Sequence, residues 1–221
     1  MNEFIDMFSN SDPASVSTSV KLLLLLTIFS LAPGILIMMT CFTRIIIVLS
    51  FVRTSLATQQ MPPNQVLIGL ALFLSFFIMA PTFTEVYDQG LQPLFDEEIT
   101  LDEAYENASA PLKDFMAQHT RQKDLALFLN YTQAESPETV QDIPLTTLVP
   151  AFAISELKTA FQMGFMIFIP FLIIDMAVAS VLMSMGMMML PPVMISLPFK
   201  ILLFVLVDGW YLITQSLLGG F

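Results

Sequence analysis

Long uncharged hydrophobic runs alternate with one extended polar stretch along the chain. The runs cover residues 22–39 with an extension at 45–52, residues 66–80, residues 159–190 and residues 193–218. A helix needs about 20 mainly apolar residues to cross a bilayer. The pattern therefore predicts an all-α, integral membrane-type protein with four long apolar helices arranged as two hairpins. Pro33 and Pro170 lie inside the first and third runs, which predicts kinked helices that pack on other protein.

The polar stretch carries helical periodicity of its own. Apolar side chains at Leu112, Phe115 and Met116, and again from Leu125 to Leu129, recur at helical spacing with charges between them. This pattern predicts two short amphipathic helices, separated near Pro111.

The borders of this amphipathic segment also carry local signals. Thr100 and Glu103 have the spacing of a capping box, in which each side chain bonds the backbone of the other residue. Residues 132–149 contain Ser136-Pro137 and Ile143-Pro144. Such pairs are typical of loops, so we expect a loop there.

Composition places the chain among membrane proteins. It is 56% hydrophobic and only 12% charged, whereas charged residues make up about 25% of an ordinary soluble domain. The net charge of −11 lies mostly between Glu85 and Asp142, where thirteen acidic residues face three basic ones. Nucleic acids and anionic lipid heads both prefer Lys and Arg, so the balance excludes nucleic acid as an expected partner.

These patterns divide the chain into four segments. Residues 1–19 form an acidic N-terminal segment and residues 20–90 the first helical hairpin. Residues 91–149 form an acidic extracytoplasmic insert. Residues 150–221 form the second hairpin, with a methionine-rich loop at 185–192.

The basic residues predict how the chain is oriented. Arg44 and Arg53 flank the connection at 54–64, and Lys and Arg favour the cytoplasmic side. The acidic insert and the N-terminus are then extracytoplasmic, and the loop at 185–192 is cytoplasmic. Lys21 before the first run resembles the core of a signal peptide, but the charges that precede it are acidic, so we expect a retained segment.

Seven charged residues stand within or beside the apolar runs. They are Arg44, Arg53, Glu156, Lys158, Asp175, Lys200 and Asp208. One explanation is a pathway for ions or protons, and the other is pairing between subunits that fixes their assembly. We favour pairing because acids and bases are nearly balanced. Glu156 and Lys158 are two residues apart and do not face each other on a helix, so their partners lie elsewhere.

Catalytic and metal-binding chemistry has few candidate residues. The chain has one Cys and one His, which excludes a Cys/His metal cluster and a His-based catalytic triad. We expect no enzyme activity and no cofactor. Cys41 is interpreted as a buried packing residue and His119 as a solvated residue of the amphipathic segment.

Several long motifs resemble the FliP family of flagellar export-gate proteins. They are PAFAISELKTAFQMGF (150–165), IPFLIIDMAVASVLMSMGMMMLPP (169–192), LPFKILLFVLVDGW (197–210), TCFTRIIIVLSFVR (40–53) and QQMPPNQVLIGLALFLSFFIMAP (59–81). The resemblance covers residues 22–90 and 148–218, and the acidic insert does not match in detail.

The resemblance implies a fold, a location and partners. It implies a pentameric ring of this chain in the bacterial cell membrane, at the flagellar basal body, joined by FliQ and FliR. FlhA, FlhB and an export ATPase would stand on the inner side. Unfolded flagellar subunits would leave the cytoplasm through the ring.

The methionine-rich loop then gains a role. Met185, Met187, Met188 and Met189 surround Gly186, and Pro191 and Pro192 follow. Met is uncharged, unbranched and adaptable, so a ring of these side chains would form a deformable apolar gasket around an unfolded chain. Gly186 allows a sharp turn and the prolines stiffen its exit. Packing alone is the other explanation for these methionines.

Two other functions remain open from the residues. One is a small ion channel or transporter subunit in which Asp175, Lys200 and Asp208 line the path. The halves of the chain show no inverted repeat, which such a transporter often has. The other is a membrane assembly factor without a pore.

Overall fold

The computed structural model describes residues 13–58, 61–132, 137–187 and 189–221, and every described regular element is helical. The chain divides into two units, one ending at Met38 and the other running from Met39 to Phe221. The predicted all-α class is confirmed, since the described residues contain no strand.

The first unit is the single helix α2 (Pro13–Met38). Its apolar residues from Val20 to Met38 make it long enough to cross a membrane. The Thr27 hydroxyl donates to the Leu23 carbonyl at 2.8 Å, so this polar group is satisfied within the helix. Pro33 lies inside the helix and does not end it.

The second unit begins with a helical hairpin. Helix α3 (Phe42–Ser55) is followed by α4 (Asn64–Val86), which continues through the π-helical turn η1 (Tyr87–Leu91) into α5 (Gln92–Phe95). At 14 residues, α3 is too short to meet the length of a membrane span, yet it supplies much of the core.

The polar stretch forms α6 (Leu101–His119), α7 (Gln122–Thr132) and the 3-10 turn η2 (Val140–Asp142). The predicted capping box is confirmed: the Thr100 N–H donates to Glu103 Oε2 at 2.8 Å, and the Thr100 hydroxyl accepts from the Glu103 N–H. Two helices are present as predicted.

The predicted break near Pro111 is wrong. Helix α6 continues through Pro111 and ends at His119, and its C-cap Thr120 has an extended backbone at φ −93° and ψ 129°. There the Arg121 N–H donates to the Ser155 hydroxyl of the neighbouring helix at 3.1 Å. A contact with another element therefore accompanies the break, whereas the helix continues through the proline.

The longest helix is α8 (Leu145–Ser184), with 40 residues. It starts directly after Pro144, inside the stretch predicted as a loop, and continues through Pro150 and Pro170. The predicted loop is thus too long at its C-terminal end.

Two shorter helices complete the unit. They are α9 (Pro192–Leu206) and α10 (Gly209–Leu218), which are bent by 61° relative to each other. Together they are apolar enough for one broken span, so the described chain has three helices of spanning length, or four with this pair.

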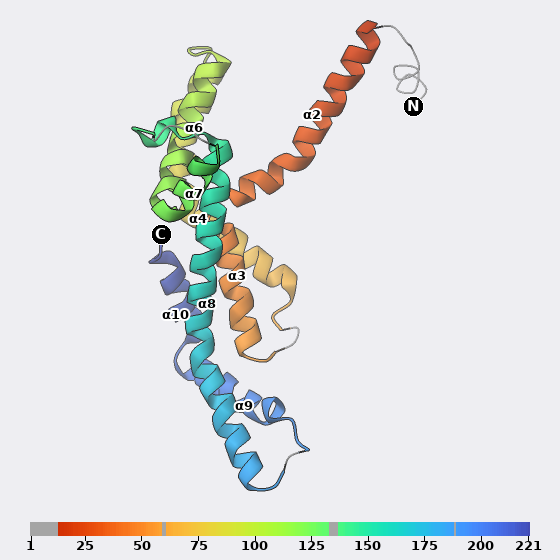
Figure 1. Ribbon diagram of the computed structural model, residues 1–221, viewed down its shortest axis with the longest axis vertical. Helices are drawn as coiled ribbons and strands as arrows, with labels where there is room; N and C mark the ends of the chain where they lie inside the picture. Colours follow the sequence, from red (N-terminus) through yellow and green to blue (C-terminus); the bar gives the residue numbers. More distant parts are fainter. Residues whose placement is uncertain (1–12, 59–60, 133–136, 188) are drawn as a thin grey trace. The chain divides into compact units, whose positions relative to one another are not determined.

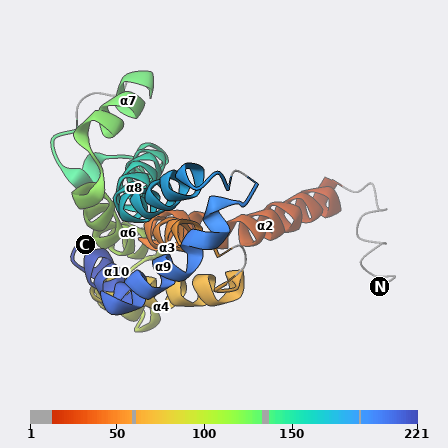
Figure 2. The ribbon, with the colours of Figure 1, turned by 90° about the horizontal axis from the view of Figure 1, so that it is seen from below.

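The core of the second unit forms around α3. This helix packs on both α4 and α8, and Figure 2 shows it between them. Its side chains at Ile45, Val48, Leu49 and Val52 are fully buried. By contrast, most apolar side chains of α4, α8, α9 and α10 are exposed. Such outward apolar surface is typical of a protein that contacts lipid or further subunits.

Candidate functional site

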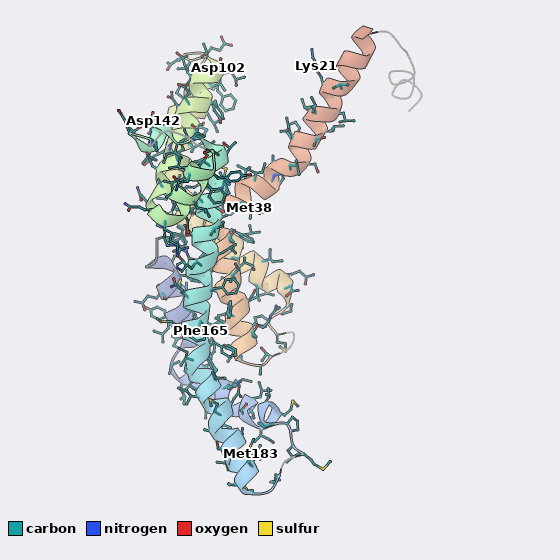
Figure 3. The ribbon with its side chains drawn as sticks, in the orientation of Figure 1. Lys21, Met38, Asp102, Asp142, Phe165 and Met183 are labelled. Carbon is teal, nitrogen blue, oxygen red and sulfur yellow. The ribbon has the colours of Figure 1, made fainter. Side chains whose placement is uncertain are left out.

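The methionine-rich turn joins α8 to α9. Figure 3 labels Met183 near the end of α8, where this turn begins. Gly186 has φ +74°, a left-handed conformation that a glycine adopts without steric cost. The Gly186 N–H donates to the Met183 carbonyl at 3.0 Å, and the Met187 N–H donates to the Leu182 carbonyl at 3.0 Å. This pair of bonds is a Schellman motif, which ends α8.

The prolines begin the next helix. Pro191 is the N-cap of α9 and Pro192 is its first residue. Proline fits there because the first N–H groups of a helix have no intrahelical partner. The Leu190 N–H and the Met194 N–H donate to the Met187 and Pro191 carbonyls at 3.4 and 3.1 Å. The turn thus gets its hydrogen bonds from the main chain.

The side chains of the turn point outward. Met185 is 65% exposed, Met187 is 41% exposed and Met189 is 98% exposed. Met188 lies outside the described residues. Because main-chain bonds hold the turn, its side chains need not be the Asn, Asp or Ser that usually stabilise turns. The turn can therefore carry flexible apolar methionine side chains at its exposed positions.

Arg44 on α3 and Glu156 on α8 form a buried ion pair. Arg44 is 4% exposed and Glu156 is fully buried. The Arg44 Nε donates to Glu156 Oε2 at 2.8 Å, and Arg44 Nη2 donates to Glu156 Oε1. A guanidinium and a carboxylate held by two parallel bonds are fixed in orientation as well as in charge.

The same guanidinium holds the last residues of the chain. Arg44 Nη1 donates to the Gly220 carbonyl at 2.8 Å, and Arg44 Cζ lies 3.7 Å from the centre of the Phe221 ring. His119 contacts this ring and that of Phe115, with centroid distances of 5.1 and 4.9 Å. His119 is therefore half-buried, and the prediction of a solvated side chain is right only in part. Burial, followed by the charge of Arg44, holds the pKa of His119 below its ordinary value.

A second ion pair joins α8 to α9. The Lys200 Nζ donates to Asp175 Oδ2 at 2.6 Å, and the Ser196 hydroxyl donates to Asp175 Oδ1. Lys200 is 2% exposed and Ser196 is fully buried. The carboxylate therefore has partners for both of its oxygens within the chain.

The remaining predicted charges lie apart from these pairs. Arg53 donates to Asn64 Oδ1 and so joins the two ends of the α3–α4 connection. Lys158 is exposed on α8. Asp208 is exposed between α9 and α10, in a left-handed conformation with φ 51° and ψ 56°.

One polar cluster was not anticipated from the sequence. Ser155 on α8 donates to Asp124 Oδ2 on α7 at 2.6 Å, and Arg121 pairs with the same oxygen at 2.6 Å. Burial alone would raise the pKa of Asp124, but the hydrogen bonds from Ser155 and Arg121 and the nearby charges outweigh it and lower the pKa. An Arg–x–x–Asp spacing signals this pair, whereas nothing in the sequence indicates Ser155.

Cys41 is fully buried, as predicted for a packing residue. Within the described part of the chain, no three His, Cys, Asp or Glu side chains come together in a group that could hold a metal ion.

The amino-acid sequence matches one family and its members along most of its length. The profile described as the FliP family matches residues 25–217. The flagellar biosynthetic protein FliP of Bacillus subtilis is 78% identical over 221 residues, which is the whole of both chains. The FliP protein of Caulobacter vibrioides is 56% identical over 202 residues, which is 91% of this chain and 76% of the relative. That of Pectobacterium carotovorum is 53% identical over 207 residues, or 94% of this chain and 80% of the relative.

Proposed function

The chain belongs to the FliP family and is a component of the flagellar export apparatus, and from this premise we propose that it is a pore-forming subunit of the export gate. Several copies form a ring, and unfolded flagellar subunits pass through it. FliP proteins are structural components and not a known enzyme family, so the subunit supplies a conduit and a seal.

The turn between α8 and α9 is the observation that carries the proposal. Met185, Met187 and Met189 are exposed, a Schellman motif fixes the backbone where the turn begins, and two prolines follow where it ends. A rigid backbone with soft side chains suits a constriction that must close around chains of different sequence. Met has three rotatable bonds and a polarisable sulfur, so it fills irregular gaps. A ring of apolar side chains also excludes water and ions by dewetting.

The two ion pairs lie within one chain, so they stabilise the subunit itself instead of joining subunits as predicted, and they do not favour ion conduction. Arg44 pairs with Glu156, and Lys200 pairs with Asp175. A paired and buried charge has no free site for a passing ion. An ion-channel function would instead need these groups to face water.

The family relationship also suggests partners and orientation. The proposed ring is a pentamer joined by FliQ and FliR, with FlhA and FlhB on the cytoplasmic side. The long apolar helices support a location in the membrane. The methionine-rich turn is proposed to be cytoplasmic, and the segment that contains α6 and α7 extracytoplasmic.

The test replaces Met185, Met187, Met188 and Met189 with Ala in a motile host. Secretion of flagellar subunits and leakage of a small dye are measured together, and assembly of the membrane complex is checked by size. We expect leakage to rise while assembly and secretion persist, because Ala leaves the backbone of the turn intact but removes the flexible side chains.

Met166 provides a matched control. It is 74% exposed near the middle of α8, away from the turn. Met166→Ala should leave leakage unchanged. Unchanged leakage in the turn variant would refute the gasket, and equal leakage in both variants would show that methionine loss acts on the complex in general. The alternative of an ion channel predicts something else. Neutral variants of Asp175, Lys200 or Asp208 would then change ion conductance while the complex still assembles.

A further inference from the structure

Helix α10 is attached to the second unit at both of its ends. At its start, Asp208 adopts a left-handed backbone conformation with φ 51°, and Gly209 follows. A Cβ on Gly209 would overlap the Phe204 ring, so the chain passes close to α9 here. The helices α9 and α10 bend by 61° at this point. The two residues thus form a sharp joint: the left-handed backbone of Asp208 is unfavourable for most residues, and Gly209 leaves room for the Phe204 ring.

The far end of α10 is held by Arg44. The Gly220 carbonyl accepts from Arg44 Nη1, and the Phe221 ring lies under the guanidinium. The Phe221 ring also contacts two rings of α6. It stacks with Phe115 at a centroid distance of 6.2 Å and an interplanar angle of 16°, and it meets His119 edge-on. Figures 1 and 2 both place this end of the chain beside α6.

Glu156 fixes the guanidinium in this position. Two of the three guanidinium nitrogens of Arg44 are bound to Glu156, which leaves Nη1 for Gly220. A Cβ on Gly220 would lie 3.3 Å from Nη1, so only a residue without a side chain brings the carbonyl this near at no steric cost. The buried pair therefore presents a preformed cationic surface to Gly220 and Phe221.

We propose that Gly220 and Phe221 form a latch that holds α10 against α3 and α6, with Asp208 and Gly209 as its hinge. The ion pair of Arg44 and Glu156 is the seat of this latch. Its function is to fix the direction of α10 relative to α9. A guanidinium over an aromatic face is attracted more strongly when it is shielded from water, and Arg44 is only 4% exposed.

The latch can be tested by hydrogen exchange in the purified full-length chain in detergent. Phe221→Ala should speed the exchange of the α10 amides by about tenfold, because the cation–π contact and the ring packing are both lost. Exchange in α8 should stay as in the wild type, since its core contacts do not involve Phe221. Phe199→Ala is the control, since this exposed ring on α9 should have no effect on α10.

A second variant separates the contribution of the cation–π contact from that of apolar packing. Phe221→Leu keeps an apolar side chain but removes the aromatic face, so α10 should again exchange faster than in the wild type. The latch is refuted if α10 keeps wild-type exchange in Phe221→Ala, or if α8 and α10 accelerate together. Wild-type exchange in Phe221→Leu would overturn the role of the guanidinium.

Discussion

At the scale of single residues, Arg44 and Glu156 show how two charges are buried between apolar helices: each is the other's counter-charge. Glu156→Gln leaves the guanidinium buried without its counter-charge. Removing one partner of a buried pair costs about 3–5 kcal/mol, so we expect a large fall in the thermal unfolding temperature of the purified chain. Lys158→Gln, two residues away on the exposed face of α8, should leave that temperature unchanged. Equal temperatures for both variants would show that Glu156 does not stabilise the fold.

Asp208 gives a second residue-scale prediction. Its φ of 51° is tolerated by Asp and Gly but strongly disfavours a β-branched side chain. Asp208→Val should therefore destabilise the chain by about 1–3 kcal/mol, measured by thermal unfolding. Asp208→Gly should be close to neutral, because glycine adopts this conformation freely. A valine variant as stable as the glycine variant would mean that the backbone relaxes at this joint.

The sequence identified the buried charges but not their partners. Helical spacing shows that Glu156 and Lys158 do not face each other, and the structure agrees, since Glu156 is buried and Lys158 is exposed. The partner of Glu156 is 112 residues away along the chain, on α3. Such a distance is set by the packing of helices, which no local pattern reports. His119 was misjudged in part for the same reason, because Phe221 covers it from a distant part of the chain.

At the scale of elements, the polar cluster of Ser155, Asp124 and Arg121 fastens α7 to α8. Although burial alone would raise it, the pKa of Asp124 is held below its ordinary value of 3.8 by the bonds to Ser155 and Arg121. A lowered pKa means that the ionised carboxylate stabilises the folded state. This contribution is fully present above the ordinary value and disappears as the pH falls through the lowered one.

Asp124→Asn tests this contribution. Hydrogen bonds to a charged group contribute about 1.5–3 kcal/mol, so the variant should unfold at a lower temperature than the wild type near neutral pH. The difference in unfolding temperature between the wild type and Asp124→Asn should stay constant down to about pH 5 and then shrink toward zero. Glu103→Gln provides the control. The pKa of Glu103 is lowered by hydrogen bonds to Thr100 at the start of α6, away from the contact between α7 and α8. A difference that is independent of pH would show that Asp124 acts through its shape and not its charge.

Local signals predicted some element borders and missed others. The capping box at Thr100 was found because both partners lie within one turn. The Schellman motif at Gly186 is similarly local. Helix α6 ends at His119, next to the contact of Arg121 with Ser155 on another helix, so Pro111 was a misleading signal. Helix α8 continues through two prolines, which a long helix tolerates as kinks.

At the scale of the whole second unit, α8 separates two surfaces of different chemistry. Its N-terminal end lies beside the acidic segment of Asp102 and Asp142, and its C-terminal end leads to the methionine-rich turn beyond Met183 (Figure 3). With a rise of 1.5 Å per residue, a helix of this length spans about 60 Å. Because that exceeds the thickness of about 40–45 Å of a bilayer with its headgroups, the two ends can reach opposite sides of the membrane.

Cysteine labelling in intact cells tests this arrangement. Single cysteines at Asp114 on α6 and at Met187 in the turn are introduced together with Cys41→Ser, and both positions are accessible in part. A membrane-impermeant maleimide should label Asp114→Cys in spheroplasts but should label Met187→Cys only after the membrane is opened. Thr54→Cys, beside the α3–α4 connection, should behave like Met187→Cys, because the neighbouring Arg53 favours the cytoplasmic side. Labelling of Met187→Cys in closed spheroplasts would reverse the orientation, and would place the gasket on the outer face.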